Sequence, residues 1–338
     1  MNACSSDLSL QVAEYCAAIG HDPLLVQGAG GNVSWKKDDV LHVKASGTWL
    51  ADAMDREIFV QVDLAELRLA LDAGNFNVKP RPLGKTTLRP SIETLLHALL
   101  PQRVVMHLHA IELLAHLVRV DAEAILQERV GNRLPWVIVD YEKPGAELAR
   151  AVHGALQRRP DTQVIFLRNH GVVIGADNVD QASAAIELLC ELLATQPAAH
   201  AAASTHLPRD LSDEYRHIDD AQVHELALHE ELFHRLETEW ALYPDHVVFL
   251  GARPELYASE AAFFEARAAG ALPELVFIAG RGVFARHTFN EAKTAQLRCY
   301  YDVLARQPDS DRTVCLGPAQ VADLLNWDAE RYRMSVAK

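Results

Sequence analysis

Two histidines stand two residues apart inside an otherwise apolar segment, "VVMHLHAIELL", Val104 to Leu114. Side chains of a strand alternate between its two faces, so residues two apart share a face. If the segment is extended, His107 and His109 therefore aim their imidazoles at one point. An isolated His-x-His pair is also explained by two hydrogen-bonded core or edge histidines. A metal site would require further donors from elsewhere in the chain.

His170, in "LRNHGVVIG", is the best candidate for a third metal ligand. It interrupts an apolar run at a polar point, where Gly171 could let the backbone pass close to a metal. Three protein ligands with one open position are typical of catalytic zinc, although imidazoles also accept manganese, cobalt or iron. Taken alone, His170 is more simply explained as a turn residue than as a metal ligand.

Glu93 opens the helix predicted for "SIETLLHALL", where the helix dipole stabilises a carboxylate. It could also be only a favourable first-turn glutamate, with His97 as its neighbour on the helix surface. The short side chains beside glycine in "GNVS" and "ASG", and the serine of "PSIE", expose hydrogen-bond donors for a phosphate or carboxylate. Lys85 and Arg89 precede "PSIE" and could bind an anionic substrate instead.

The elements that must position these residues alternate in type, as expected for an α/β or α+β layered fold. Helices are predicted at 8–20, 63–74, 91–100 and 180–196, and strands at 40–46, 103–109 and on both sides of the polar tip in 164–176. Small residues and prolines at 197–210 predict a linker.

A second region follows this linker. It contains a helical stretch from about Ser212 to Tyr243, the strand candidates "HVVFL" and "LVFIAGRGVFA", and the helix "NEAKTAQLRCYYDVLA". Gly280 and Gly282 have the spacing of a dinucleotide-binding motif, but strand-like residues follow where that motif needs a helix. A hairpin is the simpler prediction.

Composition limits the possible partners. The chain has 338 residues, 49% hydrophobic, which is enough for two domains, and its net charge of −14 disfavours nucleic acid and anionic membranes. No basic leader or membrane-length apolar run is visible, and the five scattered cysteines form no C-x-x-C motif. These features predict a soluble cytoplasmic protein with reduced thiols.

The order of the motifs, "GNVS", "ASG", "PSIE", "HLH" and "NHG", resembles the class II aldolase/adducin family, the fuculose-phosphate and rhamnulose-phosphate aldolase group. The resemblance covers about Leu25 to Gln196. It implies that His107, His109 and His170 hold Zn²⁺ and that Glu93 is the catalytic acid/base, which can also close the metal shell without substrate. It places phosphate-binding groups on Asn32, Ser46, Gly47 and Ser91.

The same resemblance implies a three-layer αβα sandwich with a largely antiparallel central sheet, assembled as a homotetramer with sites at subunit contacts. The implied activity is that of a zinc-dependent aldehyde-lyase, cleaving a sugar or sugar phosphate through a metal-stabilised enediolate. A decarboxylase, epimerase or dehydratase of sugar-acid type would use the same machinery. A non-catalytic oligomeric module, as in adducin, is the alternative of a different class.

Three features depart from the family pattern. Ile92 stands where the aldolases have a second phosphate-binding serine, so a phosphorylated substrate is less firmly implied. The segment "VDAEAILQERVGNRL" lacks the tyrosine that a neighbouring subunit contributes, and Tyr141 matches a different family tyrosine. After the linker, the chain resembles the connector of bifunctional aldolase/short-chain dehydrogenases.

We therefore predict a metal-binding catalytic domain at 1–205 and a small C-terminal α/β extension at 206–338, without a nicotinamide site. The histidines of the connection and extension form no ligand pattern, and we expect them at the surface: His200, His206, His217, His224, His229 and His234.

Overall fold

The computed structural model describes residues 8–198, 207–308 and 312–337. By their contacts these residues form two compact units. Unit 1 comprises 8–117, 121–194 and 327–337, and unit 2 comprises 118–120 and the described residues between 195 and 326. The sequence assigned the whole of 206–338 to one extension, whereas contacts group 327–337 with unit 1. Most of the predicted linker lies outside the described residues.

Unit 1 is built on a seven-stranded sheet in the order β3-β2-β1-β4-β7-β6-β5. Neighbouring strands are antiparallel except β5 and β6, which are parallel. The strands are β1 (Asn32–Lys37), β2 (Val40–Lys44), β3 (Phe59–Asp63), β4 (Val104–Leu108), β5 (Trp136–Val139), β6 (Val164–Leu167) and β7 (Gly171–Ala176).

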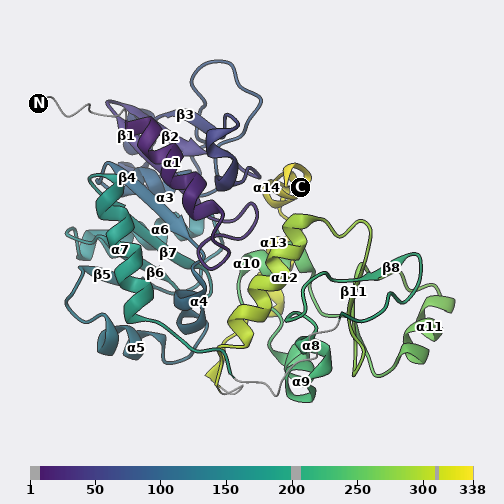
Figure 1. Ribbon diagram of the computed structural model, residues 1–338. Coiled ribbons are helices and arrows are strands. Elements are labelled where there is room, and N and C mark those ends of the chain that lie inside the picture. Colours follow the sequence, from purple (N-terminus) through teal and green to yellow (C-terminus); the bar gives the residue numbers. More distant parts are fainter. Residues whose placement is uncertain (1–7, 199–206, 309–311, 338) are drawn as a thin grey trace, which may run out of the picture. The chain divides into compact units, whose positions relative to one another are not determined.

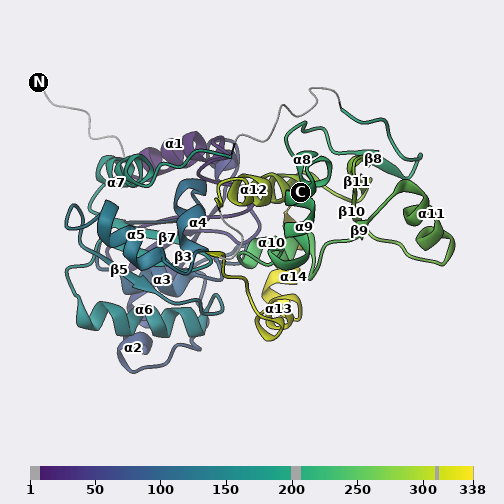
Figure 2. The same ribbon diagram turned by 90° about the horizontal axis from the view of Figure 1, so that it is seen from below.

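Helices cover both faces of this sheet, as Figure 2 shows with α1 and α7 on one side and α2 and α6 on the other. The period-two alternation of β4 explains the layering, because Met106 packs in the cluster with α1 and α7, whereas Val105 packs with α3 and α6. The three-layer αβα prediction is confirmed. The helices are α1 (Leu8–Gly20), 3-10 helix η1 (Leu50–Met54), α2 (Leu64–Asp72), α3 (Thr94–Leu99), α4 (Ile111–Leu117), α5 (Ala122–Arg129), α6 (Ala146–Arg158), α7 (Val179–Leu192) and α14 (Asp328–Val336).

Local sequence explains where the helices near the site begin and end. The side chain of Asp63 accepts a hydrogen bond from the Glu66 N–H and so caps α2. The predicted helix from Ser91 begins only at Thr94, which makes Glu93 its N-cap residue, and it ends just before Pro101. Glu93 therefore lies at the junction of a loop and a short, buried helix.

Unit 2 contains a four-stranded sheet in the order β8-β11-β10-β9; β8 and β11 are labelled in Figure 1 and all four strands in Figure 2. Strands β10 and β11 pair antiparallel around Gly280 and Gly282, so the predicted hairpin is confirmed. The elements are β8 (Tyr215–His217), α8 (Glu225–Leu228), α9 (Glu230–Thr238), α10 (Pro244–Leu250), β9 (Leu256–Tyr257), α11 (Glu260–Ala268), β10 (Leu275–Ile278), β11 (Gly282–Arg286), α12 (Glu291–Leu304) and α13 (Pro318–Leu325).

Two predictions for unit 2 were wrong. The segment "HVVFL" is part of helix α10, which Pro244 starts at a position where its missing N–H costs nothing. Every residue of α10 is buried, and the short apolar run "VVFL" at its end gives the same sequence signal in a buried helix as in a buried strand. The predicted helical stretch 212–243 instead contains β8 and the short helices α8 and α9.

None of the helices in the described part of the chain combines the length and the hydrophobicity that crossing a membrane would require. The described cysteines, Cys16, Cys190, Cys299 and Cys315, form no disulfide bonds.

Candidate metal centre

The three predicted histidine ligands lie together. His107 is in β4, His109 follows the end of that strand, and His170 lies in the turn between β6 and β7. One nitrogen from each ring lies within 4.8 Å of the others, and all three side chains are buried. The Nε2 atoms of His107 and His109 are 3.1 Å apart. The fold thus brings His170 to His107 and His109, more than sixty positions earlier in the sequence, and the three imidazoles face one point.

A tight β6–β7 turn brings His170 to the other two rings. Asn169 adopts a left-handed conformation with φ of 50°, which asparagine tolerates better than most residues. Gly171 has no room for a side chain, because a Cβ there would lie 2.4 Å from the Leu108 carbonyl oxygen and 3.1 Å from the His109 ring. The predicted close backbone approach at Gly171 is confirmed.

Glu93 contributes a buried carboxylate to the same point. Its Oε2 lies 3.4 Å from His107 Nε2, and its Oε1 lies 3.2 Å from His170 Nε2. Burial alone would raise the pKa of Glu93, but electrostatic interaction with the adjacent His107 and His170 rings and a hydrogen bond from Asn32 lower it to about 2. The group is therefore a carboxylate at neutral pH.

The donor set fits a divalent cation. Two ligands about 2.0–2.1 Å from a tetrahedral ion lie roughly 3.3 Å apart, close to the 3.1 to 3.4 Å separations found here. His107 Nδ1 lies 3.1 Å from the Val172 carbonyl oxygen, so its N–H can donate there and leave Nε2 as the ligand atom. Three neutral imidazoles and one carboxylate suit zinc and other first-row ions.

A chain of buried hydrogen bonds ends at Glu93. Asn32 Nδ2 donates to Glu93 Oε2 at 2.9 Å, and its Oδ1 contacts His97 Nε2. The amide oxygen must accept from His97, so the other ring nitrogen accepts from the Ser34 hydroxyl at 2.6 Å. Burial lowers the pKa of His97 to about 3, which keeps the ring neutral. His97 was expected on the helix surface, but it is fully buried.

Asn32 therefore has a different environment from the expected one. The resemblance placed a phosphate-binding group there, yet both ends of its side-chain amide are bonded within the protein. One sequence signal could have revealed this series of hydrogen bonds: Glu93 and His97 lie one helical turn apart, just before a buried strand.

The other predicted anion-binding residues lie on two paired segments. Ala45 and Pro90 form an antiparallel bridge, so Ser46 pairs with Arg89, whose carbonyl oxygen accepts from the Ser46 N–H at 2.9 Å, and Ser91 pairs with Lys44. The Ser91 hydroxyl accepts from the Glu93 backbone N–H at 3.2 Å. Both serines line a cavity of about 420 Å³ together with Ile92 and Arg89.

Lys85 and Tyr141 are placed differently. Lys85 is exposed and is not among the residues that line this cavity, unlike Arg89. Tyr141 is partly buried in the segment between β5 and α6.

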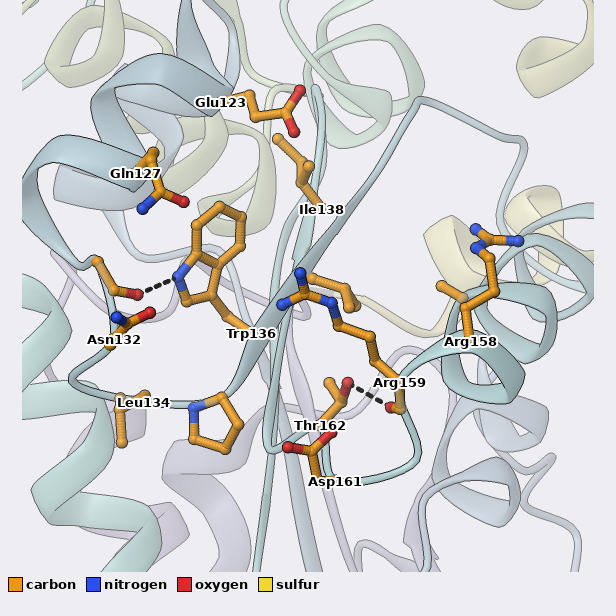
Figure 3. A pocket seen from close by; sticks show the side chains of 14 residues that line it. Glu123, Gln127, Asn132, Leu134, Trp136, Ile138, Arg158, Arg159, Asp161 and Thr162 are labelled. Atoms are coloured by element: carbon orange, nitrogen blue, oxygen red, sulfur yellow. Dashed lines mark hydrogen bonds between the residues drawn. The ribbon is translucent and has the colours of Figure 1, made fainter.

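A second cavity, of about 650 Å³, lies along β5 and includes none of the predicted site residues (Figure 3). In it the Trp136 indole donates to the Gly131 carbonyl and the Thr162 hydroxyl to the Arg159 carbonyl.

One surface prediction was wrong in unit 2. His224 is buried, accepts a hydrogen bond from the Val283 N–H at Nδ1 and lies 2.8 Å from the Ile218 carbonyl through Nε2. His217 and His229 are partly buried and His234 is exposed, while His200 and His206 lie outside the described residues. None of the described histidines of unit 2 belongs to a three-residue metal-binding cluster.

The comparison with known families agrees with this geometry. The family model "Class II Aldolase and Adducin N-terminal domain" matches residues 10–196. The chain belongs to the class II aldolase and adducin family. That match covers the whole central sheet and every residue of the three-histidine cluster.

The individual proteins that resemble this chain share less than a third of their residues with it over the matched region. "Uncharacterized oxidoreductase YuxG" of Bacillus subtilis is 29% identical over 171 residues, which is 46% of this chain and only 24% of that protein. The N-terminal class II aldolase domain of a conserved Thermoplasma acidophilum protein is 27% identical, with a TM-score of 0.47, over 57% of this chain and 94% of that one. A sugar-phosphate aldolase from Thermotoga maritima is 14% identical, with a TM-score of 0.45, and the match covers 55% of this chain and 91% of that one.

Proposed function

We propose that this class II aldolase family member is a divalent-metal-dependent lyase that cleaves a sugar or sugar phosphate by a retro-aldol reaction. The observation that carries the proposal is the position of the Glu93 carboxylate, within 3.4 Å of two of the three clustered imidazoles. An adducin-like scaffold gives no reason to bury a carboxylate and three imidazoles at one point, since burying ionisable groups costs free energy.

The histidines and Glu93 have different proposed roles: the histidines hold a cation and Glu93 moves a proton. His107, His109 and His170 would hold the ion, Zn²⁺ being the preferred candidate, and Glu93 could complete its shell. A bound divalent cation would supply Lewis-acid polarisation of the hydroxy-carbonyl group of the substrate. Retro-aldol cleavage moves one proton. The hydroxyl on the departing carbon loses it as that carbon becomes the aldehyde, and the carbon next to the substrate carbonyl, which keeps the electron pair of the broken bond, gains it. Glu93, a carboxylate, would accept this proton and deliver it. Asn32 keeps the carboxylate oriented toward the cluster.

A decarboxylase, epimerase or dehydratase acting on a sugar acid is the second candidate. It is favoured by Ile92, which lines the cavity in place of a hydroxyl donor, and by Arg89, which suits a carboxylate as well as a phosphate. We also propose a homo-oligomer, with a tetramer as in the family, which sedimentation analysis would test.

Elemental analysis of the purified protein, combined with a screen of ketose phosphates, ketoses and hydroxy-keto acids, tests the proposal. About one metal ion per chain with aldehyde release is the expected result. Metal with carbon dioxide release would favour the decarboxylase. A well-folded chain without stoichiometric metal, and without activity after zinc addition, would favour the scaffold and contradict the proposal.

A further inference from the structure

The last helix of the chain, α14, lies in unit 1 and forms one wall of the cavity that contains Ser46 and Ser91. Trp327, Ala329 and Tyr332 line the cavity from this segment. The chain leaves unit 1 after Ala194 and returns to it only at Trp327. Nothing in the family match, which ends at residue 196, assigns a role to this helix.

Glycines let α14 sit directly on the loops beside the candidate site. A Cβ on Gly47 would lie 2.6 Å from Val336 Cβ and 2.9 Å from the Arg333 carbonyl oxygen, and Gly47 has a φ of +81° that favours glycine. A Cβ on Gly145 would lie 3.4 Å from the Trp327 ring. The close packing of the backbone against α14 therefore requires glycine at position 47, whereas at Gly145 a Cβ would only be in ordinary contact with Trp327.

Cations from the sheet side lie over the aromatic rings of the C-terminal segment. The Arg89 guanidinium carbon is 4.0 Å from the centroid of the Tyr332 ring, and Lys143 Nζ is 4.9 Å from that of Trp327. Asp328 lies 4.0 Å from Arg89 in an exposed ion pair. Tyr332 thus supports Arg89, the cationic group of the cavity wall that immediately precedes "PSIE".

The cavity contains one buried hydroxyl without a partner among the described residues, together with two cationic side chains. Ser46 is 6% exposed, and its hydroxyl has no hydrogen-bond partner among the described residues. Ser91 is two residues from Glu93, so this end of the cavity adjoins the histidine cluster along the chain. Lys79 and Arg89 are among the described residues that line the cavity, and no acidic residue is. A buried hydroxyl and two cations match an anionic group.

We infer that α14 is a specificity-determining wall of the substrate pocket: Tyr332 and Trp327 enclose the anionic end of the substrate and hold Arg89 over it. The inference rests on the proposed function, because it assumes that the substrate reaching Glu93 extends into this cavity. The Tyr332 ring, 4.0 Å from the Arg89 guanidinium carbon, limits the positions of that exposed side chain, so that less freedom is lost when it pairs with an anion. Carboxylate and phosphate share this chemistry, and binding measurements distinguish them.

The test measures anion binding directly, by calorimetric titration of the full chain with inorganic phosphate and, separately, with malonate. We expect one of the two to bind, and Tyr332→Ala to weaken that binding by roughly tenfold. Tyr332→Phe keeps the ring and should retain the affinity. Ser335→Ala, an exposed position on the same helix whose hydroxyl bonds only the Tyr332 carbonyl, is the matched control. Tighter phosphate binding would identify a phosphorylated substrate, and tighter malonate binding a sugar acid.

Arg89→Gln gives a second route if Tyr332→Ala does not fold, because the Arg89 side chain is 58% exposed and its replacement leaves the Tyr332 ring in place. Equal affinity in the wild type and in both variants, or no binding of either anion to the wild type, would overturn the inference.

Steady-state kinetics separate this inference from the proposed function. With the active substrate, Tyr332→Ala should raise KM about tenfold with kcat and metal content unchanged. If the variant turns over substrate with an unchanged KM, the role of α14 in substrate binding is contradicted and the lyase activity is supported. If anion binding depends on Tyr332 but the protein holds no metal and shows no turnover, the role of α14 is supported and the lyase activity is contradicted.

Discussion

Asn32 and His107 are direct partners across the antiparallel strands β1 and β4. Because paired residues project their side chains to the same face, Asn32 reaches the carboxylate of Glu93 beside the His107 ring. The strand register thus positions a residue that holds the candidate acid/base.

His107→Ala should lose bound metal and all turnover. The imidazole is fully buried between His109 and Glu93, so alanine leaves a two-histidine site with an open coordination position. Elemental analysis of the folded variant checks this, with His234→Ala as the control because that exposed histidine is outside the cluster. Unchanged metal content in His107→Ala would refute the site.

Glu93→Gln should largely keep the metal and lose proton transfer. Three imidazoles remain to hold the ion, while the amide cannot exchange a proton, so kcat should fall by about 10²- to 10⁴-fold. Parallel metal analysis and steady-state kinetics give both quantities. A variant that keeps wild-type kcat would show that Glu93 is not the acid/base.

Asn32→Ala should lower kcat by about tenfold and leave metal content unchanged, because a hydrogen bond to a charged group is lost and the Glu93 carboxylate is no longer oriented. A side chain that instead binds substrate phosphate would raise KM for phosphorylated substrates at constant kcat. The two kinetic constants therefore decide between the role seen in the structure and the role implied by the family. Ser34→Ala should have a smaller effect, because Ser34 is connected to Asn32 only through two hydrogen bonds by way of His97.

His97 should make the protein less stable in acid. Its pKa is lowered by burial and by the charges of Lys36 and His107, against an opposing effect of Glu93, to about 3 from the ordinary 6.5. Below pH 6.5 the unfolded chain binds a proton at this residue that the folded protein refuses until about pH 3. The free energy of unfolding therefore decreases as the pH is lowered through this window, by up to about 1.4 kcal/mol per pH unit.

Urea denaturation between pH 4 and 6 measures this slope. His97→Gln, which cannot titrate, should show a correspondingly shallower dependence, and His234→Gln, at an exposed position, should match the wild type. Equal slopes in all three proteins would mean that His97 takes up its proton in the folded state as readily as in the unfolded one.

Gly171→Ala should destabilise the fold by roughly 1–3 kcal/mol and reduce metal affinity, because the new Cβ meets the Leu108 carbonyl oxygen and the His109 ring. Thermal unfolding and metal titration check the two effects. Gly154→Ala in helix α6 is the matched control: a Cβ there meets only the Arg158 side chain, at 3.6 Å, and it should stabilise by about 0.5–1 kcal/mol. Equal stability of both variants would contradict the crowding at Gly171.

Short-range pattern predicted much of the fold. Apolar periodicity and capping residues placed α1, α2, α7, β4 and the β10–β11 hairpin. It failed at α10, because a helix buried on all sides has no polar face to reveal its period. It also failed at β8, a three-residue strand inside the stretch predicted to be helical, because the pairing of β8 with β11 rather than local propensity decides its form.

The sequence by itself determined the candidate chemistry, since the types and order of His107, His109, His170 and Glu93 already indicate a metal and a proton carrier. Only the tertiary structure decided how these groups are held. Strand register, which no local pattern specifies, set Asn32 against Glu93 and buried His97 behind it. The return of α14 to the first unit depends on packing between residues almost 300 positions apart, such as Gly47 and Val336, and sequence periodicity carries no information at that separation.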